Sequence, residues 1–228
     1  YSFAFRTWYR FLQRRLARSG ARLLTVSEFS RGRIAAALGV DQASIGVLPE
    51  GGEHILRVAA EDAVLAKHGL APARYALVVG NPAAHKNLAA LTAAAEVLGA
   101  HGLTLAVAGA ADPAVFGGGG GAAAEAARVL GRVSDAELRA LYANALCLVF
   151  PSRYEPLGNV LIQSWAHGLP VVAAASQGPS ALIRNEEDGL LVPIDDAGAL
   201  AEAVNRMIAD PMLCIRMVHN GSERVEAD

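Results

Sequence analysis

The chain has 228 residues, of which 53% are hydrophobic and 18% are charged, and its formal net charge is −2. This length suits one large domain or one and a half, and the charge gives no reason to expect a nucleic-acid partner. No apolar run reaches the roughly 18 to 20 residues that a helix needs to span a bilayer. Cys147 and Cys214 lie far apart without a C-x-x-C pattern. We therefore expect two buried thiols in a reducing compartment, and neither a disulfide nor a zinc site.

Residues 1–19 are expected to form an amphipathic helix. The apolar side chains on one face are Phe5, Trp8, Leu12 and Leu16, and the opposite face carries Arg6, Arg10, Arg14 and Arg18. Two interpretations stay open: a surface helix packed on its own protein, or a basic helix lying on an anionic membrane.

The next elements are short. We expect a strand at Leu23–Val26, a helix at Ser30–Leu38 that Gly39 ends, and a strand at Ser44–Leu48. The segment Pro49-Glu50-Gly51-Gly52 then breaks the pattern and predicts a hinge.

After the hinge, strands and helices alternate regularly. The expected strands are Tyr75–Val79, Leu103–Ala108, Arg128–Leu130, Cys147–Phe150, Pro170–Ala174 and Leu190–Val192. The expected helices are Ala60–His68, Asn87–Leu98, a capping-box helix at Ser134–Asn144, one that begins near Gly158, Gly178–Arg184 and Ala197–Ile208. Gly117–Gly121 is expected to be a flexible loop. Strands that are apolar throughout, separated by helices, predict an α/β fold with a parallel sheet covered on both faces.

Three loops should meet where the strands end. Ligands of such sheets bind beyond the carboxyl ends of the strands, and the loops Gly80–Lys86, Pro151–Gly158 and Ser176–Pro179 all fall there. Lys86 could meet a phosphate beside a helix N-terminus, or it could be an ordinary surface lysine. Glu155 could accept hydrogen bonds from sugar hydroxyls, or it could be a solvated loop carboxylate.

Several other chemistries are disfavoured. His54, His85 and His167 lack the spacing of metal ligands, so we expect no metal site. There is no G-x-S-x-G elbow and no Walker P-loop, and the pentaglycine fits no dinucleotide fingerprint.

The order of short motifs carries a resemblance. The motifs are Val26-Ser27-Glu28-Phe29-Ser30, Leu48-Pro49-Glu50-Gly51, Val79-Gly80 with Lys86-Asn87, Val107-Ala108-Gly109, Leu130-Gly131-Arg132-Val133-Ser134, Phe150-Pro151-Ser152-Arg153-Tyr154-Glu155-Pro156-Leu157-Gly158, and Gly168-Leu169-Pro170-Val171-Val172. Together they resemble the C-terminal half of a retaining GT-B-fold glycosyltransferase of family 4, also called glycosyl transferases group 1.

The resemblance implies a Rossmann-like, doubly wound domain that binds a UDP- or GDP-linked sugar without a divalent metal or other cofactor. By this resemblance, Lys86 contacts the donor pyrophosphate and Glu155 the transferred sugar, and both are the catalytic candidates. The remaining donor-binding candidates are the strand-end residues Gly80 and Asn81, the base-contacting Arg132 and Val133, the backbone amides of Gly158, Asn159 and Val160, and Gln163.

This chain departs from the family pattern at charged positions. Gln163 stands where the family has a ribose-binding Glu, Asn81 replaces an Arg, Ala181 replaces a Glu, and Glu50 replaces an Asn. One lost charge-assisted contact costs about 1.5 to 3 kcal/mol, so donor binding could be much weakened.

The resemblance also implies three segments: residues 1–50 as the tail of an N-terminal acceptor domain with its linker, 51–210 as the nucleotide-sugar domain, and 211–228 as a C-terminal helix. The strand at Leu23–Val26 would then belong to a sheet that this chain lacks. We therefore expect a fragment, or one subunit of a split enzyme, whose partner supplies the acceptor-binding domain.

Three functions remain open at this stage. The first is the donor side of a cytoplasmic glycosyltransferase of polysaccharide or glycolipid biosynthesis, with residues 1–19 either packed on the protein or in peripheral contact with the membrane. The second is a binding or scaffold module with weakened or lost catalysis. The third is an unrelated doubly wound protein such as an epimerase or nucleotide-binding regulator, which the missing dinucleotide fingerprint disfavours.

Overall fold

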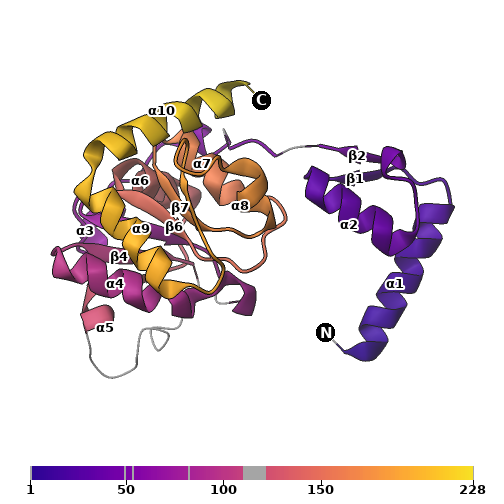
Figure 1. Cartoon of the computed structure of the whole chain (residues 1–228), viewed down its shortest axis with the longest axis horizontal. Helices are drawn as coiled ribbons and strands as arrows, with labels where there is room; N and C mark the ends of the chain where they lie inside the picture. The colour runs from indigo at the N-terminus through magenta and orange to yellow at the C-terminus, as the bar shows by residue number, and fades with distance from the viewer. Residues whose placement is uncertain (1, 49, 53, 82, 110–121, 228) are drawn as a thin grey trace. The chain divides into compact units, whose positions relative to one another are not determined.

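The computed structural model describes residues 2–48, 50–52, 54–81, 83–109 and 122–227. The chain divides into two compact units, Tyr1–Glu50 and Gly51–Asp228 (Figure 1). Each unit is described by itself below. Pro49 of the expected hinge and the glycine run Gly117–Gly121 lie outside the described residues.

The first unit is a small α/β layer. Its elements are α1 (Phe3–Arg18), β1 (Leu23–Thr25), α2 (Glu28–Leu38) and β2 (Ile45–Val47). The Ser27 side chain caps α2 by accepting a hydrogen bond from the amide of Ser30, and Gly39 ends this helix with a φ of 69°. β1 pairs in parallel with β2, so the strand that we expected to lack a partner in this chain has one on one side.

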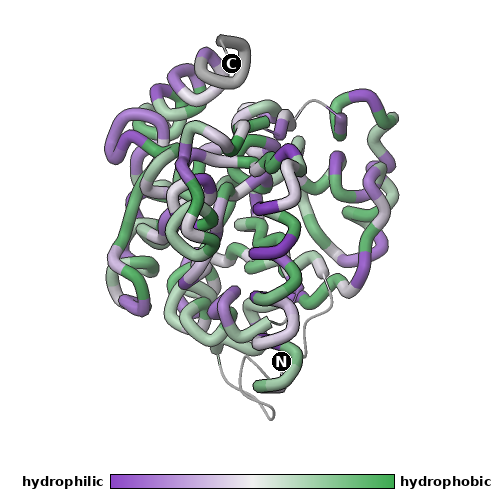
Figure 2. Tube along the Cα trace, turned by 90° about the vertical axis from the view of Figure 1, so that its right-hand side faces the viewer, coloured by the Kyte–Doolittle hydropathy of each residue, from purple (hydrophilic) through white to green (hydrophobic). Residues whose placement is uncertain are grey.

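The apolar face of α1 is uncovered within the first unit. The exposed fraction is 62% for Trp8, and the large apolar side chains Phe3, Phe5, Tyr9, Phe11, Leu12 and Leu16 are exposed too. In Figure 2 the colour along α1, which starts beside the N-terminal label, alternates between hydrophobic and hydrophilic. Among the described residues, no helix is both long and apolar enough to cross a membrane.

The second unit is built on a six-stranded parallel sheet with the order β5-β4-β3-β6-β7-β8. The strands are β3 (Tyr75–Val79), β4 (Thr104–Ala108), β5 (Ala127–Gly131), β6 (Cys147–Phe150), β7 (Val171–Ala174) and β8 (Leu190–Val192). The chain adds strands outward from β3 to β5, then returns to the other side of β3 and continues from β6 to β8. The strand order therefore reverses between β3 and β6, which is the point where doubly wound sheets bind ligands.

Helices cover both faces of this sheet. They are α3 (Ala63–Lys67), α4 (Leu91–Ala100), α5 (Ala122–Ala126), α6 (Asp135–Asn144), α7 (Asn159–Ala166), α8 (Gln177–Leu182), α9 (Ala197–Ala209) and α10 (Pro211–Ala227), and α4 lies beside α9 (Figure 1). Successive residues of β3 point into opposite cores: Ala76 and Val78 into one, Tyr75 and Leu77 into the other. The predicted α/β, Rossmann-like architecture is confirmed.

Local differences have local causes. The helix expected from Asn87 begins at Leu91, because Asn87 has a left-handed φ of 54° and a 3₁₀ turn at Leu88–Ala90 follows it. The capping box of α6 is present as predicted. Both cysteines are free, as predicted, and burial raises the pKa of Cys147 to about 12. Cys214, however, is only half-buried.

Candidate functional site

Lys86 and Glu155 form an ion pair at the carboxyl edge of the sheet. The Lys86 Nζ lies 2.7 Å from Glu155 Oε2, although the two residues are 69 positions apart in the sequence. The ammonium also lies 5.2 Å from the centre of the Phe150 ring. The exposed fractions of the two side chains are only 19% and 17%, so the pair is partly shielded from water and strengthened accordingly.

The pair sits at the point where the strand order reverses. Lys86 ends the 3₁₀ turn Ala84–Lys86 after β3, and Glu155 lies in the loop after β6. The Lys86 stem runs across Gly80, with its Cγ, Cδ and Cε within 3.9 Å of where a Cβ would stand. The two loops that we expected to meet therefore do so through side chains of opposite charge.

The third expected loop also joins the site. The Gly178 amide donates a hydrogen bond of 2.7 Å to the Glu155 carbonyl oxygen. A Cβ at Gly178 would stand 2.4 Å from the Leu157 carbonyl oxygen and 2.7 Å from that of Glu155, so only glycine allows this approach. The backbone beside the carboxylate is thus fixed by contact with α8.

α7 begins directly at the site. Its N-cap residue Gly158 has a left-handed φ of 94°, and a Cβ there would stand 2.9 Å from Leu161 Cδ1. The first amides of a helix have no partner within it, so those at Asn159 and Val160 are available to a ligand and carry the positive end of the helix dipole. The Val160 side chain packs against the core, whereas the Asn159 Oδ1 atom is buried without a hydrogen-bond partner in the described part of the chain.

Two further polar groups at this edge have no partner. The hydroxyls of Ser152 and Ser176 are buried and make no hydrogen bond with any residue that the structure describes, and each serine lies two positions after the end of its strand, β6 or β7. Buried unsatisfied hydroxyls are rare in folded proteins and need an explanation such as a bound ligand. We did not single out these serines from the sequence; the signal is a polar residue close behind an apolar strand.

Gln163 is engaged inside the protein. Its Oε1 accepts a hydrogen bond of 3.0 Å from the buried Tyr142 hydroxyl, whose pKa burial raises, and its Nε2 lies 3.1 Å from His54 Nε2. The other ring nitrogen of His54 lies 3.3 Å from the Gly51 carbonyl oxygen. Each end of the amide therefore has one partner among the neighbouring residues, and one N–H and one lone pair of the oxygen remain for a further hydrogen bond.

The remaining candidates are Asn81, Arg132 and Val133. Asn81 is exposed, and its Oδ1 accepts a hydrogen bond from the Ala83 amide at 3.3 Å. Arg132 is exposed and Val133 half-buried, directly after the edge strand β5. Among the described residues, no hydrogen bond or ion pair links Arg132 or Val133 to Lys86 or Glu155. In that part of the chain, no three His, Cys, Asp or Glu side chains are grouped to hold a metal.

Comparison with known proteins identifies a family and several relatives with similar sequences. Residues 73–210 match the family described as Glycosyl transferases group 1. The lipopolysaccharide core biosynthesis glycosyltransferase LpsE of Rhizobium meliloti (strain 1021) is 41% identical over 99 residues, which are 42% of this chain and 29% of that protein. The alpha-maltose-1-phosphate synthase of Mycobacterium tuberculosis is 34% identical over 176 residues, which are 71% of this chain and 46% of that protein.

A solved structure shares the fold. Anabaena HepE, crystallised in complex with UDP and glucose, superposes with a TM-score of 0.74 at 19% identity, over 91% of this chain and 59% of that one. For LpsE and the alpha-maltose-1-phosphate synthase, the aligned residues make up less than half of the relative's own length. Because the family match spans more than half of the 228 residues, the chain belongs to the glycosyl transferases of group 1.

Proposed function

We propose that the unit Gly51–Asp228 binds a nucleotide-sugar donor at the carboxyl edge of its sheet, and forms the donor side of a retaining, metal-independent glycosyltransferase. One observation carries this proposal. A shielded lysine and glutamate, 2.7 Å apart, lie where the strand order reverses and beside the start of α7. A cation, helix amides and a sugar-binding carboxylate are the groups that a sugar diphosphate requires.

Each group has a separate task. The Lys86 ammonium and the amides of Gly158, Asn159 and Val160 bind the pyrophosphate and stabilise the negative charge that grows on it as the glycosidic bond breaks. Glu155 and the unpaired Asn159 Oδ1 accept hydrogen bonds from hydroxyls of the transferred sugar. The donor is UDP- or GDP-linked and no further cofactor takes part; the UDP and glucose bound to HepE support a uridine nucleotide.

Donor binding must compete with the ion pair. The Lys86 ammonium is paired with the Glu155 carboxylate. A diphosphate has to take over the ammonium, which frees the carboxylate to accept sugar hydroxyls. The Lys86 ammonium therefore exchanges the carboxylate for the diphosphate. Its net contribution to the free energy of donor binding is smaller than that of an unpaired cation.

A second candidate is a binding module with weak or no transfer. The observations that favour it are the partly occupied amide of Gln163, and Asn81, whose side chain closes its own turn where the family has an arginine. Donor binding is common to both candidates, and they differ in turnover.

Calorimetric titration tests the proposal. UDP, GDP and their glucose and mannose conjugates are titrated into the wild-type chain, Lys86→Met and Lys67→Met. Lys67 is a matched control, because it pairs with Glu137 at 2.8 Å outside the site. We expect saturable binding by wild type and Lys67→Met, and a loss of about tenfold or more in Lys86→Met. Absence of saturable binding, or equal binding by the two variants, would contradict the proposal.

We further propose that the acceptor side is supplied by polypeptide that covers the first unit. Besides the face of α1, Leu24 within β1 and Leu48 directly after β2 are 62% and 65% exposed, as in an incomplete α/β layer. Trp8 fluorescence with phosphatidylglycerol vesicles tests the membrane as the alternative, since Trp165 is buried. We expect unchanged emission; a vesicle-dependent blue shift would assign this face to the membrane.

A further inference from the structure

One carboxylate ties together three loops at the carboxyl edge. Asp195 follows β8, and its Oδ1 accepts a hydrogen bond of 3.2 Å from Asn87 Nδ2 and another, of 2.5 Å, from Arg153 Nε. Asn87 belongs to the segment after β3, and Arg153 to the loop after β6. We refer to these three side chains as the clasp.

Two residues of the clasp are close neighbours of the catalytic candidates in the sequence. Besides its bond to Asp195, Arg153 donates its backbone amide to the His85 carbonyl oxygen at 2.8 Å and its Nη1 to that of Ala84 at 3.4 Å. Lys86 lies between His85 and Asn87, and Glu155 lies two residues beyond Arg153. The contacts of Asp195 and Arg153 therefore connect the segment that carries Lys86 to the loop that carries Glu155.

The backbone at the clasp is unusual. Asn87 and Asp195 have φ values of 54° and 64°, a left-handed region that few residues other than glycine adopt. Only 5% of Asn87 is exposed, so its amide is held in place. A glycine at position 195 would take up this backbone more easily, but it could not accept the two hydrogen bonds. The Arg153–Asp195 pair is about half exposed, so its contribution to overall stability is small.

We propose that Asp195 is a positioning residue, which acts through Asn87 and Arg153 to hold the loops of Lys86 and Glu155 in place, so that the ammonium and the carboxylate face the same ligand. The proposal rests on the proposed function for the role of the pair, whereas the clasp itself can be tested without nucleotide. Two amides report on it: that of Arg153, bonded to His85, and that of Gly178, bonded at 2.7 Å to the carbonyl oxygen of Glu155.

The experiment measures hydrogen exchange at these two amides in the full chain for Asp195→Ala, Asp195→Asn and Asp195→Gly. In Asp195→Ala we expect exchange about tenfold faster at both amides, because Arg153 Nε and Asn87 Nδ2 lose their shared acceptor and the loops open more often. Asp195→Asn keeps an acceptor oxygen and should restore nearly wild-type exchange. Asp195→Gly relieves the left-handed backbone without restoring the acceptor, so it should exchange as fast as Asp195→Ala.

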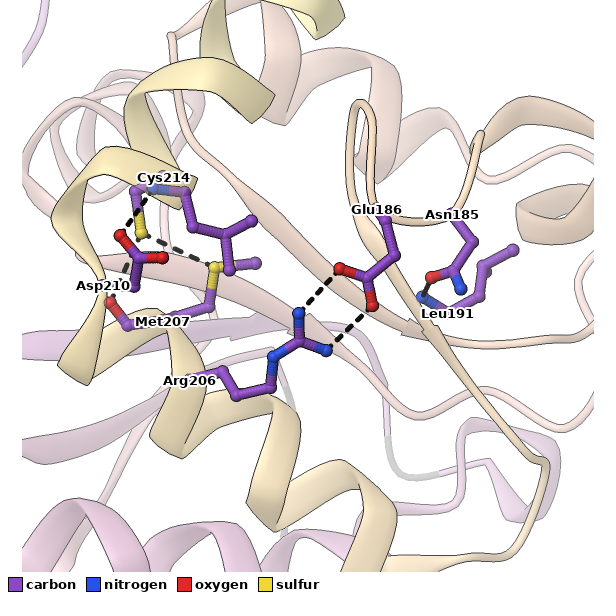
Figure 3. A network of polar contacts seen from close by, with 8 residues as sticks. Asn185, Glu186, Leu191, Arg206, Met207, Asp210 and Cys214 are labelled. Carbon is purple, nitrogen blue, oxygen red and sulfur yellow. Dashed lines mark hydrogen bonds and ion pairs between the residues drawn. The ribbon is translucent and has the colours of Figure 1, made fainter.

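Glu186→Ala is the matched control. Glu186 also has a left-handed φ, of 70°, and its carboxylate accepts two hydrogen bonds, of 2.8 and 2.6 Å, from Arg206 (Figure 3). It precedes β8, at the opposite edge of the sheet from Asp195. Glu186→Ala removes a similar ion pair, but it should leave hydrogen exchange at the Arg153 and Gly178 amides unchanged.

UDP titration of the same variants gives the second readout. We expect about fivefold to tenfold weaker binding in Asp195→Ala, and binding within twofold of wild type in Asp195→Asn and Glu186→Ala. Unchanged exchange in Asp195→Ala would overturn the clasp, and faster exchange with unchanged UDP binding would overturn its positioning role. A wild-type chain that binds no nucleotide would contradict the proposed function instead, and exchange would then decide the clasp alone.

Discussion

The second unit contains two lysine–glutamate pairs of nearly equal length in different settings. Lys86 and Glu155 are 2.7 Å apart, and Lys67 and Glu137 are 2.8 Å apart. Lys67 is 59% exposed although Glu137 is only 13% exposed, and the pair joins two helices, where its hydrogen bond raises the lysine pKa and lowers that of the glutamate. Lys86 is shielded and joins two strand-end loops. A short distance therefore does not identify a binding site; burial, unpaired polar atoms and a helix N-terminus around the pair do.

The tight contact of Gly178 with the Glu155 loop should give the largest effect on stability. In Gly178→Ala the new methyl group collides with the Leu157 carbonyl oxygen, and we expect a loss of about 2 to 3 kcal/mol in the free energy of unfolding. Gly198→Ala is the control, because it lies in α9 with its nearest atom 3.4 Å away, and it should be neutral or slightly stabilising. Urea titration measures both; equal stabilities would show that the loop yields without cost.

A double-mutant cycle compares the two lysine pairs directly. We expect Lys86→Met and Glu155→Gln to couple by about 1 to 2 kcal/mol in the free energy of unfolding, because the pair is shielded. The cycle with Lys67→Met and Glu137→Gln should give a smaller coupling, since water screens the exposed Lys67 ammonium. A larger coupling for Lys67 and Glu137 would remove the electrostatic distinction between the two settings.

A pH-dependent effect should be the smallest. The Arg206 hydrogen bond holds the pKa of Glu186 below its ordinary value of 4.5, so its stabilisation is present above that pH and fades as the pH falls. Arg206→Met should therefore cost about 0.5 kcal/mol near pH 7, after screening of a half-exposed pair, and almost nothing near pH 3. Thermal unfolding at both values measures it; an equal loss at both would assign the effect to lost packing.

The sequence predicted the sheet and the convergence of its loops, because buried strands and helix caps have recognisable local sequence patterns. Every expected strand of the second unit is present within one or two residues. The partners of Gln163 could not be predicted, because Tyr142 and His54 come from other segments. Asp195 was missed for the same reason: an exposed loop aspartate looks like any other until the fold brings it to Arg153. The roles assigned to Lys86 and Glu155 stay predictions.

The most direct test of the central claim is the sign of two changes in UDP affinity, measured by calorimetry. If the diphosphate takes Lys86 from Glu155, Lys86→Met should weaken UDP binding by about tenfold or more, whereas Glu155→Gln should tighten it by about threefold to tenfold by freeing the ammonium. Weaker binding of UDP in both variants, or no change in either, would contradict the account of this pair as the donor site.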